Sequence, residues 1–178
     1  MDDTTWIAPN QEQLQQILNT AAQFYKINNI HINPDKSQLL IINGKTIDFD
    51  TGVSMDNTTI PGCKRGTPVR ILGVWHDSAG NKKYQKQLIY NKTFITRNLL
   101  GRKKITDKQM RYIINYVLTP SLEYLLNDII LPERTCNFLI SKLATTFKHK
   151  IGLAKTIPSL AIFNKYEYGI FYIWDRQL

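Results

Sequence analysis

The chain is poor in cysteine and has no long apolar run. Its 178 residues include two cysteines, Cys63 and Cys136, which are too few and too far apart in sequence for a disulfide framework or a structural zinc site. We therefore expect an intracellular setting, either cytoplasmic or nuclear. No stretch of about 18 apolar residues occurs, and no basic start precedes an apolar segment at the N-terminus. Neither a membrane partner nor secretion is predicted.

Common metal and nucleotide sites are missing from the sequence as well. The three histidines, His31, His76 and His149, are scattered without the spacing of metal ligands. No glycine-rich phosphate loop occurs. What is present is the composition of a folded protein: 43% of residues are apolar and 21% are charged, in a chain long enough for one domain or two small ones.

Acidic residues are scarce in one part of the chain. Residues 82–111 contain ten Lys/Arg and one acidic residue, so this segment alone carries as much net charge, +9, as the whole chain. Such a block indicates a polyanionic partner, most often nucleic acid, although a solvated helix face is the simpler alternative. The candidate nucleic-acid-binding residues are Lys82, Lys83 and Lys86, which helical spacing brings together, and the run Arg102, Lys103 and Lys104.

The first 79 residues have a mixed α and β pattern. Apolar residues recur at helical spacing over residues 11–27, after a predicted N-cap at Asn10. Two short apolar runs, residues 39–42 and 46–49, flank Asn43-Gly44 and predict a β-hairpin. A loop is expected around Pro61-Gly62, and residues 69–75 are typical of one buried strand.

After residue 80 the pattern becomes helical. One helix is predicted over residues 82–100, and a second begins at Thr106, with Gln109 completing a capping box. Pro120 interrupts this second pattern, Pro132 stands at the first position of a further helix, and Gly152 ends it. The fold class expected from the sequence is therefore α+β, with a boundary near residue 80.

A pair of adjacent carboxylates, Asp2 and Asp3, stands near the N-terminus of the sequence. Two carboxylates on a tight strand turn suit two-metal nucleotidyl transfer, because Mg²⁺ takes oxygen ligands. Taken alone, the pair is more often a solvated terminus. Two later elements bear on the choice, namely Asn33-Pro34-Asp35-Lys36-Ser37 and the segment Ile71-Leu72-Gly73-Val74-Trp75.

In this order and spacing, the three elements resemble the reverse transcriptases (RNA-directed DNA polymerases) of non-LTR retrotransposons. In that family an Asp-Asp turn is followed by a helix, an Asn-X-X-Lys-Ser element and a Leu-Gly strand. Residues 105–109 and 119–124 also look like the family's thumb. The resemblance implies a partial polymerase palm in residues 1–79, with an antiparallel sheet and a packed helix. It implies an all-helical basic thumb in residues 80–178.

The resemblance also implies roles for individual residues. Asp2 and Asp3 would be catalytic ligands of Mg²⁺, and Lys36 would lie near the leaving pyrophosphate as a charge or a proton donor. Leu72 and Gly73 would form the primer grip. The implied partners are an RNA template, a DNA primer and deoxynucleoside triphosphates. Lys36 as a plain surface lysine and Gly73 as a packed strand glycine are the structural alternatives.

The chain departs from the family at its start. The aromatic residue expected before Met1, the fingers and the first palm carboxylate have no counterpart in the sequence, so we expect a fragment that is inactive alone. We also predict that Asp2 and Asp3 begin a strand paired with residues 38–42, with the 11–27 helix on one face. A non-catalytic nucleic-acid-binding module and a plain helical interaction domain stay open as alternatives, and so does the oligomeric state.

Overall fold

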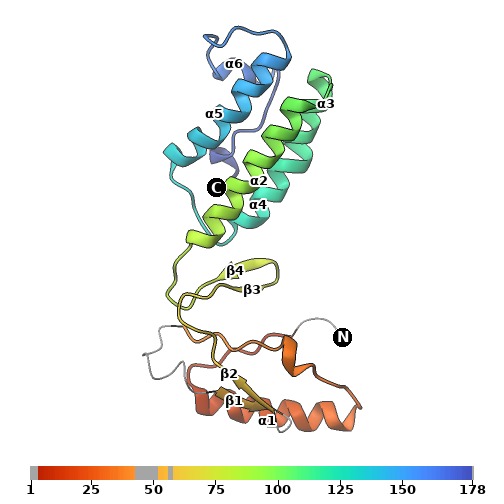
Figure 1. Ribbon diagram of the computed structural model, residues 1–178, viewed down its shortest axis with the longest axis vertical. Coiled ribbons are helices and arrows are strands. Elements are labelled where there is room, and N and C mark those ends of the chain that lie inside the picture. Colours follow the sequence, from red (N-terminus) through yellow and green to blue (C-terminus); the bar gives the residue numbers. More distant parts are fainter. Residues whose placement is uncertain (1–3, 43–51, 56–57, 178) are drawn as a thin grey trace. The chain divides into compact units, whose positions relative to one another are not determined.

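The structure is a computed structural model that describes residues 4–42, 52–55 and 58–177 (Figure 1). It contains helices and two small antiparallel sheets, which confirms the α+β class. The chain divides into two compact units, unit 1 (Met1–Lys82) and unit 2 (Lys83–Leu178). Each unit has its own hydrophobic core, and we describe each by itself.

The principal helix of unit 1 is α1 (Gln11–Ile27), whose bounds are those predicted. The Asn10 side chain accepts a hydrogen bond from the Gln13 amide at 2.8 Å, so the predicted N-cap is confirmed. Asn28 and Asn29 end the helix, Asn29 with φ of 53°. The buried face of α1 packs on the adjoining hairpin to form the core of unit 1, which contains Leu18, Ala21, Tyr25, Val53, Met55 and Ile60.

The hairpin that covers α1 is made of β1 (Gly52–Met55) and β2 (Thr58–Pro61). Its strands are antiparallel, in a register that runs from Gly52↔Pro61 to Met55↔Thr58. Side chains alternate along β1, so that Val53 and Met55 are buried while Ser54 between them is exposed.

Glutamine side chains of α1 bind the backbone of β1. Gln15 accepts a hydrogen bond from the Ser54 amide at 2.8 Å and donates one to the Ser54 carbonyl at 2.7 Å. Gln11 donates to the Gly52 carbonyl at 2.8 Å. A two-stranded sheet leaves backbone groups unpaired at its edges, and these amides satisfy three of them.

The hairpin predicted around Asn43-Gly44 is not found as predicted. Residues 43–51, which include its second strand, lie outside the described residues. Residues 39–42 form no strand, and Leu39 makes an isolated parallel bridge with Gly62. Among the described residues, pairing occurs between β1 and β2, and β2 includes Pro61 from the predicted loop. The Gln11 and Gln15 contacts with β1 are tertiary, so the local pattern did not reveal them.

A single strand over residues 69–75 was also a wrong prediction. The segment folds back on itself as β3 (Val69–Ile71) and β4 (Val74–His76), paired antiparallel with Ile71 opposite Val74. Leu72 and Gly73 form the connection, with φ of 46° and 82°. Two successive residues with positive φ are the mark of a type I′ turn, which matches the twist of a two-residue hairpin.

The predicted N-terminal strand does not form in residues 4–8, the part of it that the structure describes. Residues 4–8 have no regular secondary structure, and Asp2 and Asp3 lie outside the described residues. The expected pairing with residues 38–42 is therefore not formed by residues 4–8. The helix that the prediction placed on that sheet does pack on a sheet, but the sheet is β1–β2.

Unit 2 is built on two long helices and a segmented third. Helix α2 (Lys83–Arg102) packs against α4 (Thr119–Leu126) and α5 (Glu133–Lys150), as Figure 1 shows. Two buried clusters lie between them, one around Leu122, Leu139 and Leu143, the other around Met110, Phe147 and Ile162. The remaining helical segments are α3 (Asp107–Tyr112), η3 (Ile113–Leu118), α6 (Leu160–Phe163) and η4 (Trp174–Arg176).

The helix ends of unit 2 follow local rules. Thr106 accepts from the Gln109 amide at 3.2 Å while the Gln109 side chain accepts from the Thr106 amide at 3.0 Å, so the predicted capping box is confirmed. Helix α5 stops before Gly152, which has φ of 74°. The Leu153 amide then donates to the Lys148 carbonyl at 2.9 Å, which is the Schellman pattern. Pro132 precedes α5 as its N-cap, one position earlier than predicted.

Pro120 does not break its helix; the helical turn before it is wider than an α-helical turn. Helical structure continues from α3 through η3 into α4, and η3 is π-helical. Pro120 has no amide hydrogen for the carbonyl four residues earlier. The preceding turn widens, so that both the amide and the hydroxyl of Thr119 donate to the Ile114 carbonyl, the hydroxyl at 2.8 Å.

Candidate nucleic-acid interface

The proposed catalytic residues are only partly covered by the structure. Asp2 and Asp3 lie outside the described residues, so their distance from Lys36 is not defined. Lys36 ends the short 3-10 helix η1 (Pro34–Lys36) and is exposed. Asn33 organises this turn, because its side chain accepts from the Asp35 amide at 3.1 Å and its carbonyl accepts from the Lys36 amide at 3.2 Å. The turn holds Lys36 at the surface of unit 1.

Leu72 and Gly73 form the tip of the β3–β4 hairpin. The Leu72 side chain is 72% exposed, although leucine at positive φ is conformationally costly. A buried strand glycine was the structural alternative for Gly73, and the turn position excludes it. The two positive φ values are those of the hairpin turn between β3 and β4.

No metal site is evident in the part of the chain that the structure covers. Within residues 4–42, 52–55 and 58–177, no group of three or more His, Cys, Asp or Glu side chains is placed to hold an ion. The proposed Mg²⁺ site therefore rests on Asp2, Asp3 and the family resemblance alone.

The basic residues predicted to bind nucleic acid fall into two groups on unit 2 and its border. Lys83 and Lys86 lie in the first turn of α2 and are exposed, and Lys82 precedes them half-buried. Arg102, Lys103 and Lys104 stand at the other end of the same helix and are all exposed. A helix of 20 residues is about 30 Å long, so the two groups are separate charge clusters.

The cluster at the C-terminal end of α2 contains a residue that the sequence did not reveal. Lys150, the last residue of α5, donates a hydrogen bond from Nζ to the Lys103 carbonyl at 2.9 Å. Two helix C-termini thus meet here, and their partial negative charges favour cations. The described residues form no ion pair with Arg102, Lys103 or Lys104. We call Arg102, Lys103, Lys104 and Lys150 the basic cluster.

Two other cations of the 82–111 block serve the fold of unit 2. Arg97 donates from Nε to the Thr146 hydroxyl at 3.3 Å, which links α2 to α5. Lys92 donates to the Ser121 carbonyl at 3.4 Å, which links α2 to α4. The charge surplus of the block therefore overstates the number of cations available to a ligand.

The start of α2 is an unfavourable place for cations. A helix N-terminus carries partial positive charge and favours acids, yet the first turn of α2 contains no acidic residue. Lys83 and Lys86 therefore lie at the positive end of the helix dipole.

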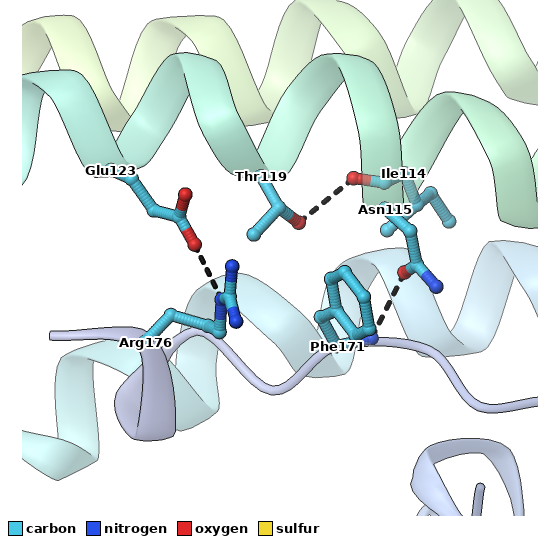
Figure 2. Close-up of polar contacts among 6 residues, drawn as sticks. All are labelled: Ile114, Asn115, Thr119, Glu123, Phe171 and Arg176. Carbon is cyan, nitrogen blue, oxygen red and sulfur yellow. Dashed lines mark hydrogen bonds and ion pairs between the residues drawn. The ribbon is translucent and has the colours of Figure 1, made fainter. Parts of the chain in front are cut away.

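A row of polar side chains fastens the C-terminal segment of unit 2 to the η3–α4 helix (Figure 2). Asn115, which is 1% exposed, donates to the Gly169 carbonyl at 2.8 Å and accepts from the Phe171 amide at 2.9 Å. Two turns further on, Glu123 pairs with Arg176 at 2.5 Å. These contacts hold Phe171 and Arg176 at the surface of the helical unit.

Comparison with known proteins adds no assignment. No protein-family model, no curated protein and no solved structure matches this chain. Within the residues that the structure describes, no helix is long and apolar enough to cross a membrane. Function is therefore inferred from the basic cluster and the Leu72-Gly73 turn.

Proposed function

We propose that the chain is part of a reverse transcriptase of the non-LTR retrotransposon type, and that unit 2 binds the backbone of a template–primer duplex. In this proposal unit 1 is palm-derived and unit 2 is the thumb. Asp2 and Asp3 bind Mg²⁺, Lys36 stabilises the leaving pyrophosphate of a deoxynucleoside triphosphate, and the Leu72-Gly73 turn touches the DNA primer. The RNA template and the primer are the nucleic-acid partners.

The observation that carries the binding part of the proposal is the basic cluster. Its members come from the ends of two helices, α2 and α5, and one of them, Lys150, is 46 positions away from Lys104 in the sequence. Cations gathered from distant segments, with no ion-pair partner for Arg102, Lys103 or Lys104 in the described part of the chain, suit phosphates. Such contacts are independent of base sequence.

Salt dependence of binding tests the proposal directly. Affinity for a template–primer duplex falls with salt with a log–log slope of about −0.9 for each phosphate neutralised. The triple variant Arg102→Ala, Lys103→Ala, Lys104→Ala should therefore flatten the slope by up to about 2.7. Fluorescence anisotropy over a series of salt concentrations measures it.

A matched control removes the same side chains elsewhere. Lys26, Lys64 and Arg65 are exposed in unit 1, so their triple Ala variant loses one arginine and two lysines from outside the cluster. This control should change the slope by less than the cluster variant does. Equal slopes for the two variants, or no binding at low salt, would refute the assignment.

A non-catalytic nucleic-acid-binding module is the second candidate, and the same basic cluster favours it. The two candidates differ in Asp2 and Asp3. Incorporation of deoxynucleotides on an RNA template with Mg²⁺ or Mn²⁺, lost in Asp2→Asn, would exclude the second candidate. Both candidates predict binding with no incorporation by this chain, so that outcome does not separate them. An in-frame aromatic residue and a palm carboxylate segment encoded upstream of Met1 would favour the polymerase.

A further inference from the structure

Two exposed tyrosines stand next to each other on unit 2. Tyr112 and Tyr116 are 61% and 59% exposed, and their ring centroids lie 5.3 Å apart with a tilt of 35°. Tyr116 also meets the ring of Phe171 edge-on at 6.1 Å. We call Tyr112, Tyr116 and Phe171 the aromatic ledge. Adjacent open rings offer flat apolar surface with hydroxyl groups at their edges.

Hydrogen bonds of Asn115 and an ion pair of Arg176 fix the residues of the aromatic ledge. Asn115, between the tyrosines in sequence, binds the Phe171 amide and the Gly169 carbonyl and so fixes the C-terminal segment beside η3. The Arg176 guanidinium lies 5.0 Å from the centroid of the Phe171 ring and is itself paired with Glu123. A preformed surface loses little conformational entropy on binding.

Two exposed cations precede Tyr112 on α3. Lys108 lies four residues before Tyr112, so both share one face of α3, and both are exposed. Arg111 is exposed, and its guanidinium lies beside Gly169, where an added Cβ would be 3.2 Å from Nη2. Asp107 is the acid of the same helix. Three members of the basic cluster, Arg102, Lys103 and Lys104, lie two to four residues before Thr106 in sequence.

Open rings and nearby cations together suit one kind of ligand. Single-stranded nucleic acid presents base faces for stacking and phosphates for cations, whereas a duplex hides its base faces within the stack. Lys108 and Arg111 belong to the 82–111 segment, whose net charge of +9 complements a polyanion. The charge around the rings therefore favours the nucleic acid.

We propose that the aromatic ledge binds unpaired nucleotides, with a base stacked on Tyr112 or Tyr116 and flanking phosphates near Lys108 and Arg111. The proposal rests on the nucleic-acid binding proposed above and extends it from duplex backbone to an unpaired strand. Stacking on an aromatic side chain tolerates any base, so little sequence preference is expected.

An abasic strand separates stacking from charge. The full chain is titrated with fluorescently labelled oligothymidylate and with an abasic strand of equal length, which has the same phosphates and no bases. One stacked base strengthens binding about 5-fold or more, so oligothymidylate should bind tighter by at least that factor. The variant Tyr112→Ala, Tyr116→Ala should bind both strands alike.

Conservative variants guard against a folding artefact. Tyr112→Phe, Tyr116→Phe keeps both rings and should keep the preference for oligothymidylate. Phe24→Ala, which removes an equally open ring (57% exposed) from α1, should keep it too. Circular dichroism verifies that each variant retains its helices.

The outcomes distinguish this inference from the proposal on which it rests. Equal affinity of the wild type for the two strands would refute base stacking on the aromatic ledge. Salt-dependent duplex binding in the same experiment would still support duplex binding by the basic cluster. A preference that persists in the Ala variant also overturns this inference, because the bases then stack elsewhere on the protein. Failure to bind either strand or the duplex overturns both.

Discussion

Asn115→Ala is the substitution whose effect on unit 2 the structure defines best. The side chain is 1% exposed and makes two hydrogen bonds, to the Gly169 carbonyl at 2.8 Å and from the Phe171 amide at 2.9 Å. Truncation leaves both backbone groups without this partner, at about 1–3 kcal/mol each. We expect a loss of about 3 kcal/mol, a large share of the 5–15 kcal/mol that is typical of a domain.

Urea denaturation followed by circular dichroism measures this loss. With a slope of about 1–3 kcal/mol per molar urea, the midpoint should fall by at least about 1 M. Amide exchange should also quicken at Ile170 and Phe171, which the segment contact protects. Asn98→Ala, an exposed asparagine on α2, is the control and should change stability by less than about 0.5 kcal/mol. If Asn115→Ala unfolds at the same urea concentration as the control, the C-terminal segment is not held by Asn115.

Two further predictions concern a turn and a thiol. Leu72→Asn should stabilise unit 1 by about 1 kcal/mol, because asparagine tolerates positive φ and removal of the exposed leucine side chain costs little buried area. A temperature of thermal unfolding that is unchanged or lower would contradict the type I′ turn. Burial raises the pKa of both thiols, at Cys136 partly offset by its hydrogen bond with Gln177. Cys136 is fully buried whereas Cys63 is half-buried, so alkylation of the native protein should be slower at Cys136. The unfolded thiol ionises at a lower pH than the folded one, so the contribution of Cys136 to the free energy of unfolding is present below a pH of about 8.5 and is lost as the pH rises above it. A free energy of unfolding that stays level in this range would contradict the raised pKa.

The helices could be predicted because their signals are local. The Asn10 cap, the Thr106 capping box and the Gly152 stop each act through hydrogen bonds between residues at most five apart. Apolar periodicity then defined the buried faces of α1 and α5. These interactions are nearly the same in any surroundings, so sequence reading located them to within one or two residues.

The hairpins could not be predicted in the same way. Asn43-Gly44 is the stronger turn signal, yet the described pairing is β1 with β2, where Gln11 and Gln15 of α1 bind the strand edge across about 40 positions of sequence. At Leu72-Gly73 a leucine stands where a turn would be expected to use asparagine or glycine. Strand pairing depends on partners that local propensity does not contain.

The candidate site shows the same division. The sequence alone determined that cations concentrate in residues 82–111 and that an Asp-Asp pair, a Lys-Ser turn and a Leu-Gly pair follow one another in order. The tertiary structure decided that Lys92 and Arg97 serve internal contacts, that Lys150 joins Lys103, and that Phe171 lies beside Tyr116. Charge and motif order are properties of the sequence. Contacts between distant side chains depend on helix packing, because they form only when the core brings those segments together.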